Sequence, residues 1–167
     1  MRMLWMPAVA LLGLTSACAS NVGSTIPSAS SPVASAPAPV AGYDWHFTPS
    51  EEAVYLAYGV AESDDLRLGL HCDVGSGKVE ISAPGPAGMR EIYLESGGET
   101  ERFPAQGEAS ELHDGDFVTA EASSSAPVFQ RFRRVGWMAQ WVGGEREVYA
   151  PHPGSEAGVE RFFARCG

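Results

Sequence analysis

Trp137 and Trp141 are the residues whose types and spacing most clearly suggest a binding surface. Together with Ala139 they occupy alternate positions, so a β-strand would place both indoles on one face. Two indoles separated by a small side chain could form a flat platform for a sugar ring, such as a unit of peptidoglycan. The alternative is that both tryptophans belong to the core, because large aromatic side chains dominate protein interiors.

A second candidate is the basic cluster of Arg131, Arg133 and Arg134. Guanidinium groups bind phosphate and carboxylate through paired hydrogen bonds, so the cluster could hold anionic groups of a cell envelope. Pairing with nearby acidic loops is the alternative. The chain as a whole has 21 acidic and 11 basic side chains and a net charge of -10. Such a surface repels phosphate backbones, and we expect no nucleic-acid partner.

Residues typical of catalysis or metal binding do not form a recognisable set. No Gly-x-Ser-x-Gly motif is present, and no spacing links a nucleophile to a histidine and a carboxylate. His71 and Cys72 would point to opposite faces of a strand, which disfavours a shared zinc ion. Asp114 and Asp116 lack the other ligands of a calcium loop. The sequence therefore predicts no metal, no cofactor and no catalysis, with an unrecognised hydrolase as the remaining alternative.

The N-terminus has the features of an export signal over residues 1–17. Arg2 precedes an apolar run, residues 4–14, that is too short to span a bilayer. The following Leu14-Thr15-Ser16-Ala17-Cys18 resembles the lipobox of bacterial lipoproteins, in which small residues precede the cysteine that receives the lipid. The resemblance implies attachment at Cys18 and, with Ala19 next, an outer-membrane protein facing the periplasm of a Gram-negative bacterium. Cleavage after Ala19 would instead give a secreted protein.

Residues 18–42 form a segment of different composition. It contains no charged side chain and is built mainly from serine, alanine, proline and valine. Such a composition cannot bury enough apolar surface to fold, which predicts a disordered linker between the lipid and a single domain over residues 43–167.

Cys72 and Cys166 are the two cysteines that remain when Cys18 carries lipid. An even number of cysteines is typical of exported proteins with disulfide bonds. The sequence thus predicts a Cys72–Cys166 bond, and two buried free thiols are the alternative.

The strands that must position these residues follow from alternating hydrophobicity. The clearest is 66–72, in which Leu66, Leu68, Leu70 and Cys72 share one face. We expect further strands at 53–60, 78–82, 91–95, 117–122, 128–132, 137–142 and 145–149, and short extended pieces on either side of Phe103-Pro104. A helix over 49–58 is an open alternative to the first of these strands. After Ser155, apolar residues recur at helical spacing.

The expected fold is therefore mainly β, an antiparallel sandwich or partial barrel with a short C-terminal helix. The strand ending in Cys72, and Phe162-Phe163 before Cys166, also resemble small exported proteins of Gram-negative bacteria, a likeness that implies no activity. The expected function is a non-catalytic envelope module that binds a protein or peptidoglycan. An acidic inhibitor of a basic, lysozyme-type hydrolase is the alternative.

Overall fold

The computed structural model describes residues 36–167. The predicted export signal, the lipid site at Cys18 and the linker up to residue 35 lie outside the described residues. Within residues 36–167, neither helix combines the length and apolar character needed to cross a membrane.

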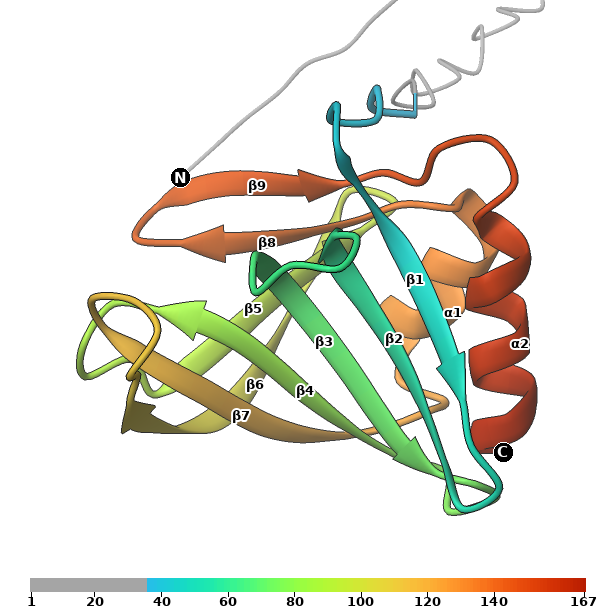
Figure 1. Ribbon diagram of the computed structural model, residues 1–167, viewed down its shortest axis with the longest axis horizontal. Helices are drawn as coiled ribbons and strands as arrows, with labels where there is room; N and C mark the ends of the chain where they lie inside the picture. Colours follow the sequence, from blue (N-terminus) through green and yellow to red (C-terminus); the bar gives the residue numbers. More distant parts are fainter. Residues whose placement is uncertain (1–35) are drawn as a thin grey trace, which may run out of the picture. The chain divides into compact units, whose positions relative to one another are not determined.

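Nine strands within the described residues form one antiparallel, nearly closed barrel-like sheet (Figure 1). Their order across the sheet is β1-β2-β3-β4-β7-β6-β5-β8-β9. The strands are β1 (Tyr43–Pro49), β2 (Ala53–Val60), β3 (Leu66–Asp73), β4 (Lys78–Gly85), β5 (Glu91–Ser96), β6 (Glu99–Ala109), β7 (Asp116–Ser123), β8 (Met138–Val142) and β9 (Glu145–Tyr149). The helices are α1 (Pro127–Val135) and α2 (Glu156–Cys166). The predicted mainly-β fold with a C-terminal helix is confirmed, and β2 is a strand rather than the alternative helix.

The long strand β6 connects the two halves of the sheet. Its residues up to Pro104 pair with β5, whereas its residues from Ala105 onward pair with β7. Proline has no backbone N–H to donate, so it suits the point at which a strand changes partner. The prediction of two short pieces around Phe103-Pro104 was wrong, because the chain stays extended through this corner.

Helix α1 corrects the prediction of a strand at 128–132. Val128, Phe129 and Phe132 are fully buried, a spacing that gives one apolar helical face. Pro127 lies in the first turn, where its missing N–H costs nothing. Gly136 ends the helix with a φ of 80°, a left-handed conformation that favours glycine.

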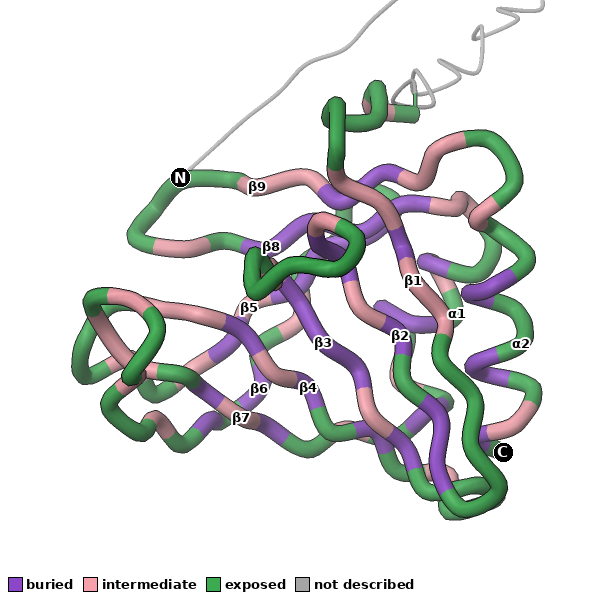
Figure 2. The backbone as a smooth tube through the Cα atoms, viewed as in Figure 1, coloured by how far each residue is buried: buried purple, intermediate pink, exposed green. Residues whose placement is uncertain are grey.

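The core lies inside the sheet and beneath the two helices (Figure 2). Leu56, Leu70 and Ile81 meet Phe129 and Phe162 there, all essentially inaccessible to solvent. Helix α2 packs closely on β1 at Gly158, where a Cβ atom would lie 3.1 Å from that of Phe47. A glycine that lowers helix propensity is therefore used for close packing.

The predicted Cys72–Cys166 disulfide is present and joins the end of β3 to the end of α2, with 5.6 Å between the Cα atoms. Backbone hydrogen bonds reinforce it, since the amides of Gly75 and Gly77 donate to the carbonyls of Arg165 and Cys166 at 2.9 and 2.8 Å. The bond closes a loop across 94 positions of sequence. A loop of this length corresponds to about 4–5 kcal/mol of stabilisation in the chain-entropy model.

Candidate functional site

Trp137 and Trp141 do not form the tandem platform that their spacing suggested. Trp141 lies on β8 and is 37 % exposed, whereas Trp137, just before β8, is only 4 % exposed. Trp137 packs with Ala139 and Ala150, and the guanidinium carbon of Arg146 lies 5.2 Å from the centre of its ring. Trp137 is therefore a core residue, which was the alternative to a surface platform. Only the indole of Trp141 is available on the surface among these two.

The indole of Trp141 is held by a charged network that spans three strands. Its Nε1–H donates to Glu95 on β5 at 2.9 Å, and Arg146 on β9 donates twice to the same carboxylate, at 2.7 and 2.9 Å. These hydrogen bonds, led by those from Arg146, lower the pKa of the nearly buried Glu95 carboxyl below its usual range. The carboxylate is therefore ionised at neutral pH and fixes the orientation of the ring.

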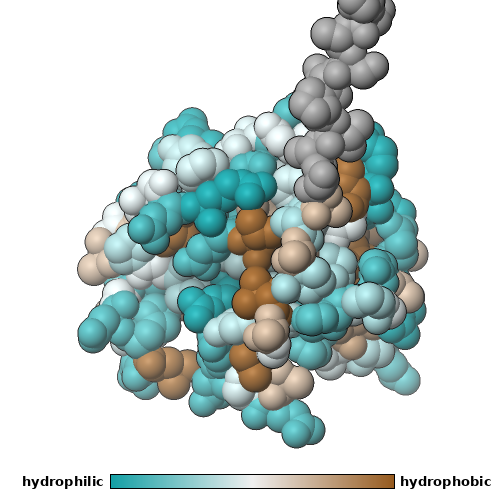
Figure 3. Space-filling view, turned by 90° about the horizontal axis from the view of Figure 1, so that it is seen from above, coloured by the Kyte–Doolittle hydropathy of each residue, from teal (hydrophilic) through white to brown (hydrophobic). Residues whose placement is uncertain are grey.

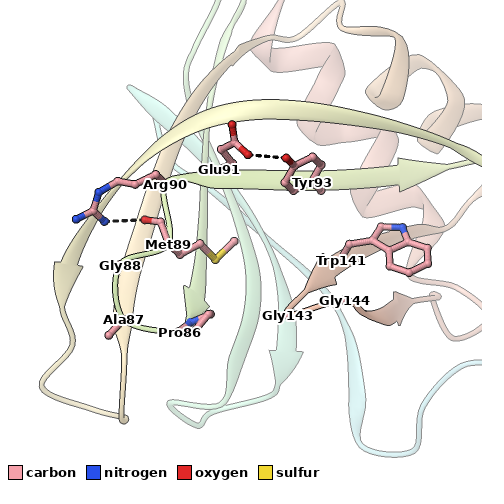
Figure 4. Close-up of a pocket in the computed structure, with 10 residues that line it drawn as sticks. All are labelled: Pro86, Ala87, Gly88, Met89, Arg90, Glu91, Tyr93, Trp141, Gly143 and Gly144. Carbon is pink, nitrogen blue, oxygen red and sulfur yellow. Dashed lines mark hydrogen bonds between the residues drawn. The ribbon is translucent and has the colours of Figure 1, made fainter.

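Tyr93 is the direct neighbour of Trp141 in the register of β5 and β8. Both side chains line an open groove of about 680 Å³ between these strands and the loop that precedes β5 (Figure 4). Met89 extends from that loop into the space in front of Trp141 (Figure 4). The groove is lined by Pro86, Ala87, Gly88, Met89, Arg90, Glu91, Tyr93, Trp141, Gly143 and Gly144.

The edge of this Tyr93–Trp141 groove carries hydrogen-bonding groups in defined protonation states. The hydroxyl of Tyr93 donates to Glu91, which also accepts from Arg102. These contacts lower the pKa of Glu91, and the bond to Glu91 raises the pKa of Tyr93. At neutral pH the groove therefore offers an ionised carboxylate and a phenol oxygen with free lone pairs, both of which accept hydrogen bonds.

No known protein family matches this chain, and neither does a curated protein or a solved structure.

The arginine cluster is distributed along α1 and does not line the groove. Arg131 donates to the carbonyl of Ser96 at 2.9 Å and to Glu101 at 2.7 Å, and its side chain is only 11 % exposed. Arg133 pairs with Glu160 at 2.9 Å. Arg134 is exposed. Arg131 and Arg133 are therefore paired with acidic side chains, as in the alternative to anion binding.

The residues considered for metal binding or catalysis do not come together in one site. Cys72 is committed to the disulfide, and the ring of His71 stacks on Tyr55 with 4.6 Å between centroids. Asp116 lies 3.6 Å from Arg90, while Asp114 is exposed. Within residues 36–167, no group of three or more histidine, cysteine or acidic side chains is arranged to hold a metal ion.

Sequence reasoning identified Trp141 but missed Tyr93, Glu95 and Arg146. The alternation of 91–95, with Ile92 and Leu94 facing inward, already placed Tyr93 and Glu95 on the outer face. What the alternation does not contain is the pairing of β5 with β8, which lie more than 40 positions apart. That pairing, together with the β8–β9 hairpin that places Arg146 opposite Trp141, brings the four side chains together.

Proposed function

We propose that the protein is a non-catalytic binding module of the cell envelope that holds peptidoglycan glycan in the Tyr93–Trp141 groove. The observation that carries this proposal is the exposed Trp141 indole, fixed by Glu95 and placed opposite Tyr93. The ring offers a rigid apolar face to the C–H groups of a sugar. Glu91 and the oxygen of Tyr93 accept hydrogen bonds from its hydroxyl groups.

The resemblance of residues 14–18 to a lipobox supports the location of this module. A lipid on Cys18 would anchor the chain in the outer membrane with its domain facing the periplasm, where the wall glycan lies. A flexible linker of the length predicted for residues 18–42 would reach about 25 Å from the membrane. A tethered domain with such reach suits capture of an immobile polymer.

Co-sedimentation with purified peptidoglycan sacculi tests the proposal. The purified protein should sediment with sacculi, and Trp141→Ala should weaken this binding about tenfold, as expected for the loss of a central aromatic contact. Trp141→Phe keeps an aromatic face but loses the N–H donated to Glu95, and should bind at an intermediate level. Tyr55→Ala is the matched control, because Tyr55 is an exposed aromatic residue on β2, outside the groove.

Two results would contradict glycan binding: a wild-type protein that stays in the supernatant, or equal sedimentation of wild type and Trp141→Ala. Each variant is first checked for a native thermal transition. Inhibition of a basic lysozyme by a protein that does not bind sacculi would favour the alternative, an inhibitor whose net charge of -10 attracts a basic enzyme.

A further inference from the structure

A second hollow opens where the sheet fails to close. Strands β1 and β9 are the two ends of the sheet order, so no strand pairing joins them among the described residues. The indole N–H of Trp45 on β1 nevertheless donates to the carbonyl of Tyr149 on β9 at 3.2 Å, so the two edges are close. Arg67 lines three hollows: one of about 230 Å³ between β1 and β9, one of about 270 Å³ beside β8 and β9, and one of about 690 Å³ beside the loop that precedes β7.

We call this region the Arg67 cleft. It lies on the inner side of β8 and β9, whereas the Tyr93–Trp141 groove lies on the outer side. The residues of the cleft used below are Tyr43, Tyr58, Arg67, His113, Gln140, Glu147 and Tyr149.

All the buried side-chain polar atoms without a partner in residues 36–167 belong to this cleft. They are Oη of Tyr58, Nε2 of His113 and Nε2 of Gln140, and the residues Tyr58 and Gln140 are only 2 % and 1 % exposed. Burial is the main cause that raises the pKa of the Tyr58 hydroxyl, and the Val40 backbone opposes this rise. Each unpaired buried polar group costs about 1–3 kcal/mol, so their concentration in one cleft points to a ligand that completes them.

Gln140 keeps one unpaired polar end in either orientation of its side-chain amide. The amide has one hydrogen-bond partner, the hydroxyl of Tyr149 at 3.0 Å, which also lies 3.3 Å from Glu147. Since a hydroxyl carries a single proton, Tyr149 serves one of these acceptors at a time. In either amide orientation, one polar end of Gln140 remains free for a ligand.

The cleft mixes donors and acceptors. His113 Nδ1 lies 3.2 Å from the carbonyl oxygen of Asp114 and donates to it; in the tautomer with its single proton on Nδ1, Nε2 accepts. Glu147 also accepts, Gln140 and Tyr58 can each supply a donor, and Arg67 donates. Hydroxyl groups match such a mixture because each one both donates and accepts.

The charges around the Arg67 cleft disfavour an anionic ligand. Arg67 already pairs with Asp65 at 3.1 Å and donates to Tyr43 at 2.8 Å. The remaining ionisable residues around the three hollows are acidic apart from His113, which disfavours an anion; they are Asp64, Asp65, Asp114 and Glu147. With Oε1 accepting from Tyr149, the free Nε2 of Gln140 is a donor, which an ammonium group cannot satisfy because it has no lone pair.

We infer that the Arg67 cleft binds a neutral polyhydroxylated ligand, a single saccharide ring. The hollow of about 270 Å³ beside Gln140 and His113 lies just below the usual range for drug-sized ligands, in agreement with one ring. This site is separate from the Tyr93–Trp141 groove and does not depend on the function proposed for it.

Nuclear magnetic resonance titration of the ¹⁵N-labelled protein tests the inference. The probes are glucose, galactose, mannose and N-acetylglucosamine, with glucuronate and glucose 6-phosphate as anionic counterparts. At least one neutral sugar should shift the side-chain NH₂ signals of Gln140, and the anionic probes should not. Gln140→Leu should weaken this binding about tenfold, which corresponds to one lost hydrogen bond, and Gln106→Leu on the outer face of β6 is the matched control.

His113→Leu provides a second variant, because His113 lines the same hollow of about 270 Å³ as Gln140 and its Nε2 is unpaired. It should weaken the same binding several-fold even if Gln140→Leu does not fold. The inference is overturned if no neutral sugar at about 50 mM shifts the Gln140 signals, or if the anionic probes bind equally well. Trp141→Ala should leave these shifts unchanged, so failure of the groove and failure of the cleft are distinguishable.

Discussion

The outer and inner faces of β8 present opposite chemistry. On the outer face, the polar atoms are satisfied and an aromatic ring is exposed, since Glu95 and Arg146 pair completely while Trp141 faces solvent. On the inner face, the aromatic rings are packed and polar atoms are left over. The rings of Tyr58 and Tyr149 pack in a tilted arrangement with 4.9 Å between centroids, while Tyr58 and Gln140 each keep an unpaired polar atom.

This difference shows how one short strand can supply two kinds of binding surface. Because successive side chains alternate, Gln140 and Trp141 are neighbours in sequence and lie on opposite sides of the sheet. Figure 3 shows one face of the molecule, on which hydrophilic residues predominate and a short central strip is hydrophobic.

The largest effect should come from removing the disulfide, which supports both faces at once. Cys72→Ala combined with Cys166→Ala should lower the free energy of unfolding by about 4 kcal/mol, because the unfolded chain regains the entropy of a long closed loop. Urea unfolding followed by tryptophan fluorescence and by the Gln140 side-chain signal should show one common, lower midpoint. Separate midpoints for the two probes would contradict a single cooperative unit.

A smaller, pH-dependent loss in the free energy of unfolding should follow from replacing Glu95 on the outer face of the sheet. Glu95→Gln loses charge-assisted hydrogen bonds and should lower the free energy of unfolding by about 2 kcal/mol at pH 7. Because the folded-state pKa of Glu95 lies below its ordinary value of 4.5, its stabilisation is complete above that pH and disappears as pH falls through the folded pKa. Chemical unfolding at several pH values should therefore show the gap between wild type and variant closing below pH 4.5. A gap independent of pH would contradict this role.

The smallest change in the free energy of unfolding should come from replacing Gln140 on the inner face of β8. Gln140→Leu removes an amide that is incompletely paired, while Tyr149 keeps Glu147 as an acceptor. The change in the free energy of unfolding should thus be within about 0.5 kcal/mol of zero, because an apolar side chain of similar size replaces an unsatisfied one. Thermal unfolding measures this difference. A loss above 2 kcal/mol would mean that Gln140 is a structural residue, and the contrast between the two faces would fail.

Local patterns in the sequence predicted most of the strands, the terminal helix and the disulfide. Helix α1 was missed although Pro127 and Gly136 mark its two ends, because Val128 and Phe129 have high strand propensity and only the burial of Phe132 reveals the helical period. The sites were predictable in part. Trp141 was visible from alternation, whereas Tyr93 meets it through the pairing of β5 with β8, and Tyr58 meets Tyr149 because the two edges of the sheet lie close together, neither of which a local pattern encodes.

The C-terminal position of Cys166 sets the order in which the cysteines become available for disulfide formation. Cys72 lies 94 positions before Cys166, so a chain exported from its N-terminus delivers Cys72 to the oxidising compartment first. Until Cys166 follows, Cys72 has no native partner, and Cys18 is the remaining cysteine of the chain. A thioether-linked lipid on Cys18 would withdraw this competitor, so that membrane attachment would also protect the fidelity of oxidation.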